Sequence, residues 1–158
     1  MTSFYKTADS FKQGSRTLPQ RYYTEDLLLE KEMENIFLNR WLCIGRSNEI
    51  KKSGEYKIFT IGNESLFIIR NENNQLMAFY NTCRHRGTRI CSKKNGKYSK
   101  SIQCPYHGWT YDLSGRLIGA PNMDAVEQFN KDNYPLFPAD LIEWEGFIFI
   151  NLSENPSE

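Results

Sequence analysis

Two short stretches, CRHRG at residues 83–87 and CPYHGW at residues 104–109, contain both histidines of the chain and two of its four cysteines. Each stretch supplies one thiol and one imidazole, and 18 residues separate His85 from Cys104. Thiolate sulfur and imidazole nitrogen at such close spacing are typical of a transition-metal site. We therefore expect the two stretches to form loops around one metal centre. Its candidate ligands are Cys83, His85, Cys104 and His107.

Two kinds of metal centre use two cysteines and two histidines. A tetrahedral zinc ion binds all four side chains itself. A Rieske [2Fe–2S] cluster binds two thiolates on one iron and two imidazoles on the other. Zinc sites of the finger type usually group cysteine with cysteine and histidine with histidine, whereas each stretch here pairs one of each. The mixed pairing favours the [2Fe–2S] cluster, and a Cys2His2 zinc-stapled interaction module is the alternative.

The composition of the chain is that of an ordinary globular domain. Its 158 residues are 39% hydrophobic and 25% charged, with a formal net charge of +1. This balance argues against disorder and against a nucleic-acid partner bound through bulk charge. No stretch approaches the roughly 20 apolar residues of a membrane helix, and the N-terminus lacks the apolar core of a secretory signal. We expect a cytoplasmic chain without a membrane partner, in which Cys43 and Cys91 are small buried side chains.

The first part of the sequence predicts an arm followed by one helix. Residues 1–20 are polar and show no sustained period, which indicates a flexible N-terminal arm. Within residues 21–41 apolar side chains recur at steps of three and four, which predicts a helix with Thr24 or Asp26 as its cap. We expect the apolar stripe of this helix to pack against the rest of the domain. Its members are Leu29, Met33, Ile36, Phe37 and Trp41.

From residue 42 onward the sequence is typical of antiparallel β-structure. Short runs of β-branched and aromatic residues are separated by turn sequences such as Gly62-Asn63 and Ser114-Gly115. Both candidate ligand loops begin just after such a run, and a short helix is expected after Asn122. The expected strands cover residues 56–61, 66–70, 76–80, 98–102, 109–113, 116–118, 141–144 and 147–152.

NTCRHRG at residues 81–87 and CPYHGWTYD at residues 104–112 resemble the two cluster loops of the α subunits of Rieske non-haem iron oxygenases, the aromatic-ring-hydroxylating type. The likeness extends from about Tyr22 to Leu152. It implies a mainly β fold, a Rieske-type antiparallel β-sandwich of small sheets with two cluster-binding loops after an N-terminal α-helix. Residues 42–152 would then form the Rieske [2Fe–2S] domain, and residues 153–158 would begin a linker to a catalytic domain outside this chain.

The resemblance also assigns residues to the surroundings of the cluster. The glycine in each loop would let the backbone pass close to the cluster or adopt positive φ. Aromatic and proline side chains would shield the cluster from water. The residues expected around the four ligands are Arg86, Gly87, Tyr106, Gly108, Trp109 and Pro121.

The loop sequences differ from those of respiratory Rieske proteins. Thr88 and Tyr106 stand where the respiratory proteins have two further cysteines joined in a disulfide, and Trp109 replaces a serine whose hydroxyl binds a cluster sulfide. Fewer hydrogen bonds leave the reduced cluster less stabilised. We therefore expect a midpoint potential near the lower end of the Rieske range of roughly −150 to +300 mV.

A run of basic residues without any acid lies between the two ligand stretches. Positive charge near the cluster favours its reduced form, although solvent screens this effect. The same charge could attract an acidic electron donor, or it could simply be a solvated surface. The run consists of Arg84, Arg86, Arg89, Lys93, Lys94, Lys97 and Lys100.

The resemblance implies one-electron transfer as the function, from a ferredoxin or flavin reductase to a mononuclear iron in a catalytic domain, usually of a neighbouring subunit. With His85 and His107 used as ligands, the chain has no histidine left for the two-His, one-carboxylate site that activates oxygen in such enzymes. We expect no catalytic residue in this chain, which would be one part of a monooxygenase or dioxygenase. A stand-alone Rieske ferredoxin is the alternative electron carrier.

Overall fold

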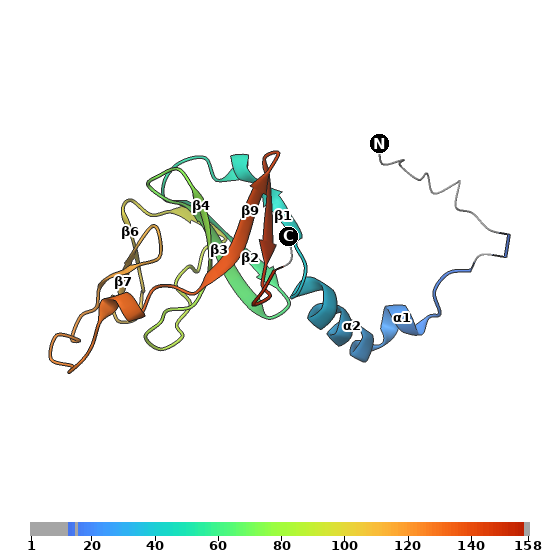
Figure 1. The fold of residues 1–158 in the computed structure, drawn as a ribbon, viewed down its shortest axis with the longest axis horizontal. Coiled ribbons are helices and arrows are strands. Elements are labelled where there is room, and N and C mark those ends of the chain that lie inside the picture. Colours follow the sequence, from blue (N-terminus) through green and yellow to red (C-terminus); the bar gives the residue numbers. More distant parts are fainter. Residues whose placement is uncertain (1–12, 15, 157–158) are drawn as a thin grey trace.

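The computed structural model describes residues 13, 14 and 16–156, and consists mainly of β-strands preceded by short helices (Figure 1). The helices are α1 (Arg21–Thr24), α2 (Asp26–Glu32), a π-helical turn (Met33–Phe37) and two 3-10 turns (Ser47–Glu49 and Lys131–Asn133). The strands are β1 (Leu42–Arg46), β2 (Glu55–Ile61), β3 (Glu64–Arg70), β4 (Leu76–Tyr80), β5 (Asn95–Lys97), β6 (Ser101–Gln103), β7 (Thr110–Asp112), β8 (Leu117–Gly119), β9 (Pro138–Trp144) and β10 (Phe147–Asn151).

The strands form two antiparallel sheets of different size. The larger sheet has seven strands in the order β1-β10-β9-β4-β3-β2-β5, and the smaller has three in the order β6-β7-β8. The smaller sheet lies at one end of the molecule, and α1 and α2 extend from the other end (Figure 1). The predicted fold class, a mainly antiparallel β domain after a helix, is confirmed.

Strand β3 is the shared wall of two hydrophobic cores. Its residues Leu66–Ile69 are fully buried, because successive side chains of a strand point to opposite faces and both faces of β3 are covered. Phe67 and Ile69 join a core that includes Cys83, Cys104 and Trp109, whereas Leu66 and Ile68 join a second core with Ile148 and Ile150. Burial of each such side chain contributes about 1.5–3 kcal/mol. The candidate ligand cysteines therefore lie in the core that contains more buried residues.

The expected strands all occur, β4 with the predicted ends and the others with shifted ends, and two strands were not predicted. β1 contains Cys43 and Gly45 and pairs with β10 across a bulge, so its conformation depends on a distant partner. β5 has the polar sequence NGK and is a strand because it pairs with the edge of β2. The strand expected over residues 98–102 is shorter, since Tyr98 stacks on Tyr56 and pairing starts at Ser101. The helix expected after Asn122 is replaced by turns and the 3-10 turn Lys131–Asn133.

The predicted N-terminal helix is present but differs in its cap and its packing. Glu25 has extended backbone angles and divides α1 from α2, so neither Thr24 nor Asp26 is the cap of a single helix. Leu29 and Ile36 are 55% and 48% exposed, and Phe37 is also exposed. The helix extends away from the sheets (Figure 1), so that the stripe contacts the second core through Met33 while these three side chains face outward. The expectation that the whole stripe packs on the domain is wrong for the described chain.

Two further expectations concern the N-terminal region and the membrane. The arm predicted over residues 1–20 lies largely outside the described residues, and residues 16–20 are exposed. Within residues 13, 14 and 16–156, no helix is long and apolar enough to cross a membrane.

Candidate metal centre

The two ligand stretches form two loops with the same backbone conformation, loop 1 (residues 83–88) after β4 and loop 2 (residues 104–109) after β6. In each loop the cysteine N–H donates to the carbonyl five residues later, and the glycine N–H donates back to the cysteine carbonyl. These bonds are Cys83 N to Thr88 O (2.9 Å), Gly87 N to Cys83 O (3.0 Å), Cys104 N to Trp109 O (2.8 Å) and Gly108 N to Cys104 O (3.2 Å). The loops are thus equivalent, with histidine one position later in loop 2.

Glycine is required in both loops by the backbone conformation. Gly87 and Gly108 have φ values of 71° and 72°, in the left-handed region that residues with a side chain rarely adopt. A Cβ at Gly87 would meet no atom within 4 Å, and a Cβ at Gly108 would lie 3.7 Å from Pro121 Cγ. Of the two roles expected for these glycines, positive φ is the one that the structure shows, and it lets each loop turn back on its cysteine.

The loops bring the four candidate ligands to one end of the core. Cys83 and Cys104 are buried, with 2% and 3% of their surface exposed. His85 and His107 are half-buried, and their ring centroids lie 4.6 Å apart. The thiols therefore form the inner part of the site and the imidazoles its outer part.

The donor set was tested against the two metal centres that the sequence allows. Within the described residues, no three Cys, His, Asp or Glu side chains converge as the ligands of a single ion. The Cys83 and Cys104 thiols lie beside each other, and so do the His85 and His107 rings. One sulfur pair and one nitrogen pair fit a cluster in which each iron takes two protein ligands. His85 Nδ1 is buried and has no hydrogen-bond partner among the described residues. An orphaned buried acceptor is costly, so this nitrogen is suited to bind a metal.

Burial and neighbouring groups shift the pKa values of the candidate ligands. Burial raises the pKa of the Cys83 thiol, while hydrogen bonds from the Tyr111 hydroxyl and the His85 N–H lower it in part. Burial, followed by the neighbouring His107 and Arg86, lowers the pKa of His85. His85 is therefore held in the neutral form that binds metals.

Tyr111 is a candidate site residue that the sequence alone does not single out. Its hydroxyl lies 3.3 Å from Cys83 Sγ and accepts a hydrogen bond from the Arg84 N–H at 3.1 Å. Burial raises the pKa of Tyr111, so that the O–H stays protonated and can donate to the sulfur. A signal was available, because Tyr111 stands between polar Thr110 and Asp112 on a strand and therefore points to the inner face.

The aromatic surroundings of the site agree in part with the expected water shield. Trp109 is buried and stacks on His85 at a centroid distance of 4.9 Å and an angle of 10°. Tyr106 lies against His107 at 3.7 Å but is 63% exposed, so it covers the imidazole at the surface. Phe129 and Tyr134 contact the Trp109 ring edge-on at 5.8 and 5.7 Å. These two were missed because residues 120–137 have no regular hydrophobic period.

The basic run between the loops forms an exposed surface, with one exception. Arg84 is half-buried and contacts other segments, whereas the remaining members are exposed. Among the described residues the ion pairs join Lys57 with Glu49 and Arg116 with Asp112, and neither involves the run. We call the exposed members the basic rim. They are Arg86, Arg89, Lys93, Lys94, Lys97 and Lys100.

The two remaining cysteines differ from each other. Cys91 is buried, as expected, and its Sγ lies 3.5 Å from the Tyr98 hydroxyl. Cys43 is exposed, so the prediction of burial is wrong for this residue. The reason is the alternation of β1, in which Leu42 and Ile44 pack on the second core and Cys43 points to the opposite face.

Comparison with known proteins agrees with this geometry. Residues 40–130 match the Rieske [2Fe–2S] domain family, and the chain belongs to this family. Its cofactor is therefore a Rieske-type [2Fe–2S] cluster. The relatives further show that the chain is the type of Rieske domain found in oxygenase subunits, which agrees with the resemblance of its two loops.

Three relatives define this relationship. The carnitine monooxygenase oxygenase subunit of Acinetobacter baumannii is 41% identical over 139 residues, which are 88% of this chain and 37% of that protein. The glycine betaine monooxygenase oxygenase subunit of Chromohalobacter salexigens is 38% identical over 152 residues, 95% of this chain and 34% of that protein. A solved quaternary ammonium Rieske monooxygenase superimposes with a TM-score of 0.84 at 40% identity, covering 89% of this chain and 38% of that one. The chain thus spans about a third of the length of the curated relatives it matches.

Proposed function

We propose that Cys83 and Cys104 bind one iron of the Rieske cluster, that His85 and His107 bind the other, and that the domain relays single electrons. The observation that carries this proposal is the equivalence of the two loops. They bring together two buried thiols and two outer imidazoles, the latter 4.6 Å apart. When bound, the cluster supplies a group that takes up and releases one electron.

The cysteines, Tyr111 and the histidines have different roles around this metal centre. The buried cysteines would hold one iron away from water, and the Tyr111 hydroxyl would donate a hydrogen bond to Cys83 Sγ. A donor to a ligand sulfur stabilises the more negative, reduced state. The half-buried histidines and the exposed Tyr106 form the outer tip of the site, where a partner would come close to the histidine-bound iron. Electrons would leave through this tip.

The partners follow from the relatives and from the surface charge. The relatives are oxygenase subunits, and one solved relative is described in connection with inter-subunit electron transfer. We therefore infer that the acceptor is a mononuclear iron in an oxygenase catalytic domain of a neighbouring subunit. The basic rim suits an acidic donor such as a ferredoxin, with a flavin reductase as the other donor class. In this assignment residues 42–152 form the Rieske domain, residues 153–158 begin a linker, and the reaction occurs in the cytoplasm.

Metal analysis tests this proposal and its rivals. We expect two irons and two acid-labile sulfides per chain, a coloured protein and an EPR signal after reduction. One zinc per chain in a colourless, redox-silent protein would establish the zinc-stapled module instead. Rapid mixing of the reduced protein with an oxygenase catalytic domain then separates an oxygenase relay from a stand-alone ferredoxin, since only the relay reduces the mononuclear iron without a further carrier.

A second inference concerns the substrate of the parent oxygenase. The similarity to carnitine and glycine betaine monooxygenases favours a quaternary ammonium compound. This rests on sequence similarity, because the four candidate ligands serve electron transfer and not substrate binding. Oxygen uptake by the complete enzyme system in the presence of carnitine or glycine betaine, compared with an aromatic hydrocarbon, checks it. Uptake with the hydrocarbon alone would contradict it.

A further inference from the structure

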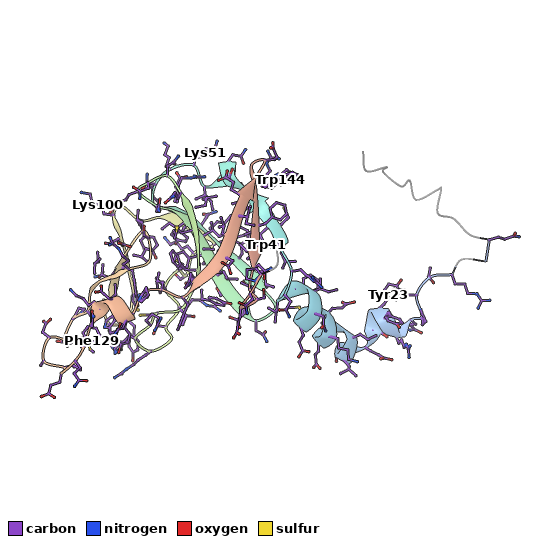
Figure 2. All side chains as sticks on the ribbon, in the orientation of Figure 1. Tyr23, Trp41, Lys51, Lys100, Phe129 and Trp144 are labelled. Atoms are coloured by element: carbon purple, nitrogen blue, oxygen red, sulfur yellow. The ribbon has the colours of Figure 1, made fainter. Side chains whose placement is uncertain are left out.

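Residues 129–137 carry an aromatic lid beside Trp109, the indole that stacks on the candidate ligand His85. The lid consists of Phe129 and Tyr134, whose rings stack on each other at 5.1 Å and contact Trp109 edge-on. Trp109 in turn stacks on His85. The lid therefore packs against the Trp109 indole, which in turn covers the His85 imidazole. Figure 2 shows Phe129 at the end of the molecule opposite Tyr23.

The main chain fixes the lid at its C-terminal end. The Leu136 N–H donates to Gly115 O at 2.8 Å, and the Tyr80 N–H donates to Phe137 O at 2.9 Å. The preceding turn is held within itself by the Tyr134 N–H, which donates to Lys131 O at 3.0 Å, and to β8 by Lys131 Nζ, which donates to Ile118 O at 3.4 Å. A further contact joins this turn to loop 1.

Arg84 provides this contact from within loop 1. Its guanidinium donates to Pro135 O at 3.1 Å and to Asn133 O at 3.4 Å. It also lies 3.9 Å from the centroid of the Phe137 ring and 5.9 Å from that of Tyr134. A planar guanidinium can donate to two carbonyls and stack on an aromatic face at the same time, which an ammonium group cannot do.

Arg84, which contacts the lid, is also part of the ligand loop. Arg84 stands between Cys83 and His85, and its own N–H donates to the Tyr111 hydroxyl. One residue thus joins the ligand loop, the donor to the ligand sulfur and the lid. We propose that Arg84 is a positioning residue that clasps the aromatic lid onto loop 1 and so keeps water from the cluster. The shielding part of this inference rests on the proposed function, whereas the clasp itself does not.

The substitution Arg84→Lys tests the clasp while keeping the positive charge. Hydrogen–deuterium exchange of the purified protein should show the Tyr134 and Leu136 amides exchanging at least tenfold faster, with the β7 amides unchanged. Arg89→Lys is the matched control, because Arg89 is exposed in the same basic run and lies beside Ile58 and Lys94. Phe137→Leu removes the ring beneath the guanidinium and should accelerate the same amides to a smaller extent. This variant keeps the test decisive if Arg84→Lys fails to fold.

The midpoint potential separates a shielding role from a merely structural one. Water admitted by an open lid stabilises the more negative, reduced cluster, so the potential of Arg84→Lys should shift upward while that of Arg89→Lys stays unchanged. Unchanged exchange at Tyr134 and Leu136 would overturn the clasp. Faster exchange with an unchanged potential would overturn the shielding. A protein that binds no iron would contradict the proposed function, and the exchange measurement would still decide whether Arg84 holds the lid.

Discussion

The Tyr111 hydroxyl lies 3.3 Å from Cys83 Sγ, although the two residues are 28 positions apart in the chain. A donor to a ligand sulfur stabilises the reduced cluster more than the oxidised one, because reduction adds negative charge. Replacement of the respiratory serine by Trp109 predicts a low potential, and a hydrogen bond from Tyr111 would keep that potential from falling further. The loop sequence alone therefore accounts for only part of the redox tuning.

Tyr111→Phe should lower the midpoint potential. The loss of one hydrogen bond of about 1 kcal/mol corresponds to about 40 mV for a one-electron couple. Tyr98→Phe is the matched control, since Tyr98 makes the same kind of contact with Cys91 at 3.5 Å, a cysteine that is not a candidate ligand. A redox titration followed by EPR measures both. Equal potentials for Tyr111→Phe and the unaltered protein would contradict the assigned role.

The ligand set predicts opposite results for the two kinds of buried cysteine. Cys83→Ala removes a thiolate from the cluster, so iron and sulfide should be lost from the purified protein. Cys91→Ala should retain both at full content, and should cost about 1 kcal/mol of folding free energy through lost packing. Iron and sulfide analysis with denaturant unfolding checks the pair. Retention of the cluster in Cys83→Ala would remove this residue from the ligand set.

Asn81 should be a major contributor to the stability of the polypeptide around loop 1. Its buried side chain accepts from the Ile90 and Cys91 N–H groups at 3.1 and 2.8 Å and donates to Cys91 O at 2.8 Å. Asn81→Ala leaves these backbone groups buried without partners and should reduce the free energy of unfolding by about 3 kcal/mol. The exposed Asn155→Ala should change it by less than about 0.5 kcal/mol. Urea denaturation distinguishes them, and similar losses in both variants would argue against the anchoring role.

The basic rim should set the rate at which an acidic donor reduces the protein. In the double variant Lys93→Glu and Lys94→Glu, reduction by a plant-type ferredoxin should slow by roughly tenfold at low ionic strength, because rim charges govern the rate of association. The difference should shrink as salt is added. Lys51→Glu with Lys52→Glu, outside the rim, is the control. Stopped-flow rates that do not depend on the rim charges would contradict electrostatic steering.

The sequence allowed the loops and most strands to be predicted because their signals are local. The ligand types, the two glycines and the runs of β-branched residues between turns all act within a few positions. Arg84 and Tyr111 could not be assigned in the same way, since their partners lie up to 51 residues away. β5 likewise forms through pairing with β2. The sequence shows the apolar period of the N-terminal helix. Periodicity alone, however, does not determine which surface packs against Leu29 and Ile36, which are exposed in the structure.

The central claim is that two imidazoles and two thiolates share one [2Fe–2S] cluster, and its most direct test is pulsed EPR on the reduced protein labelled with 15N-histidine. Two histidine nitrogens should couple to the cluster spin, and their couplings should change with the isotope. The cysteine ligands contribute no nitrogen, so the signal reports His85 and His107 alone. A paramagnetic cluster without histidine coupling, or a protein without any such signal, would contradict the account.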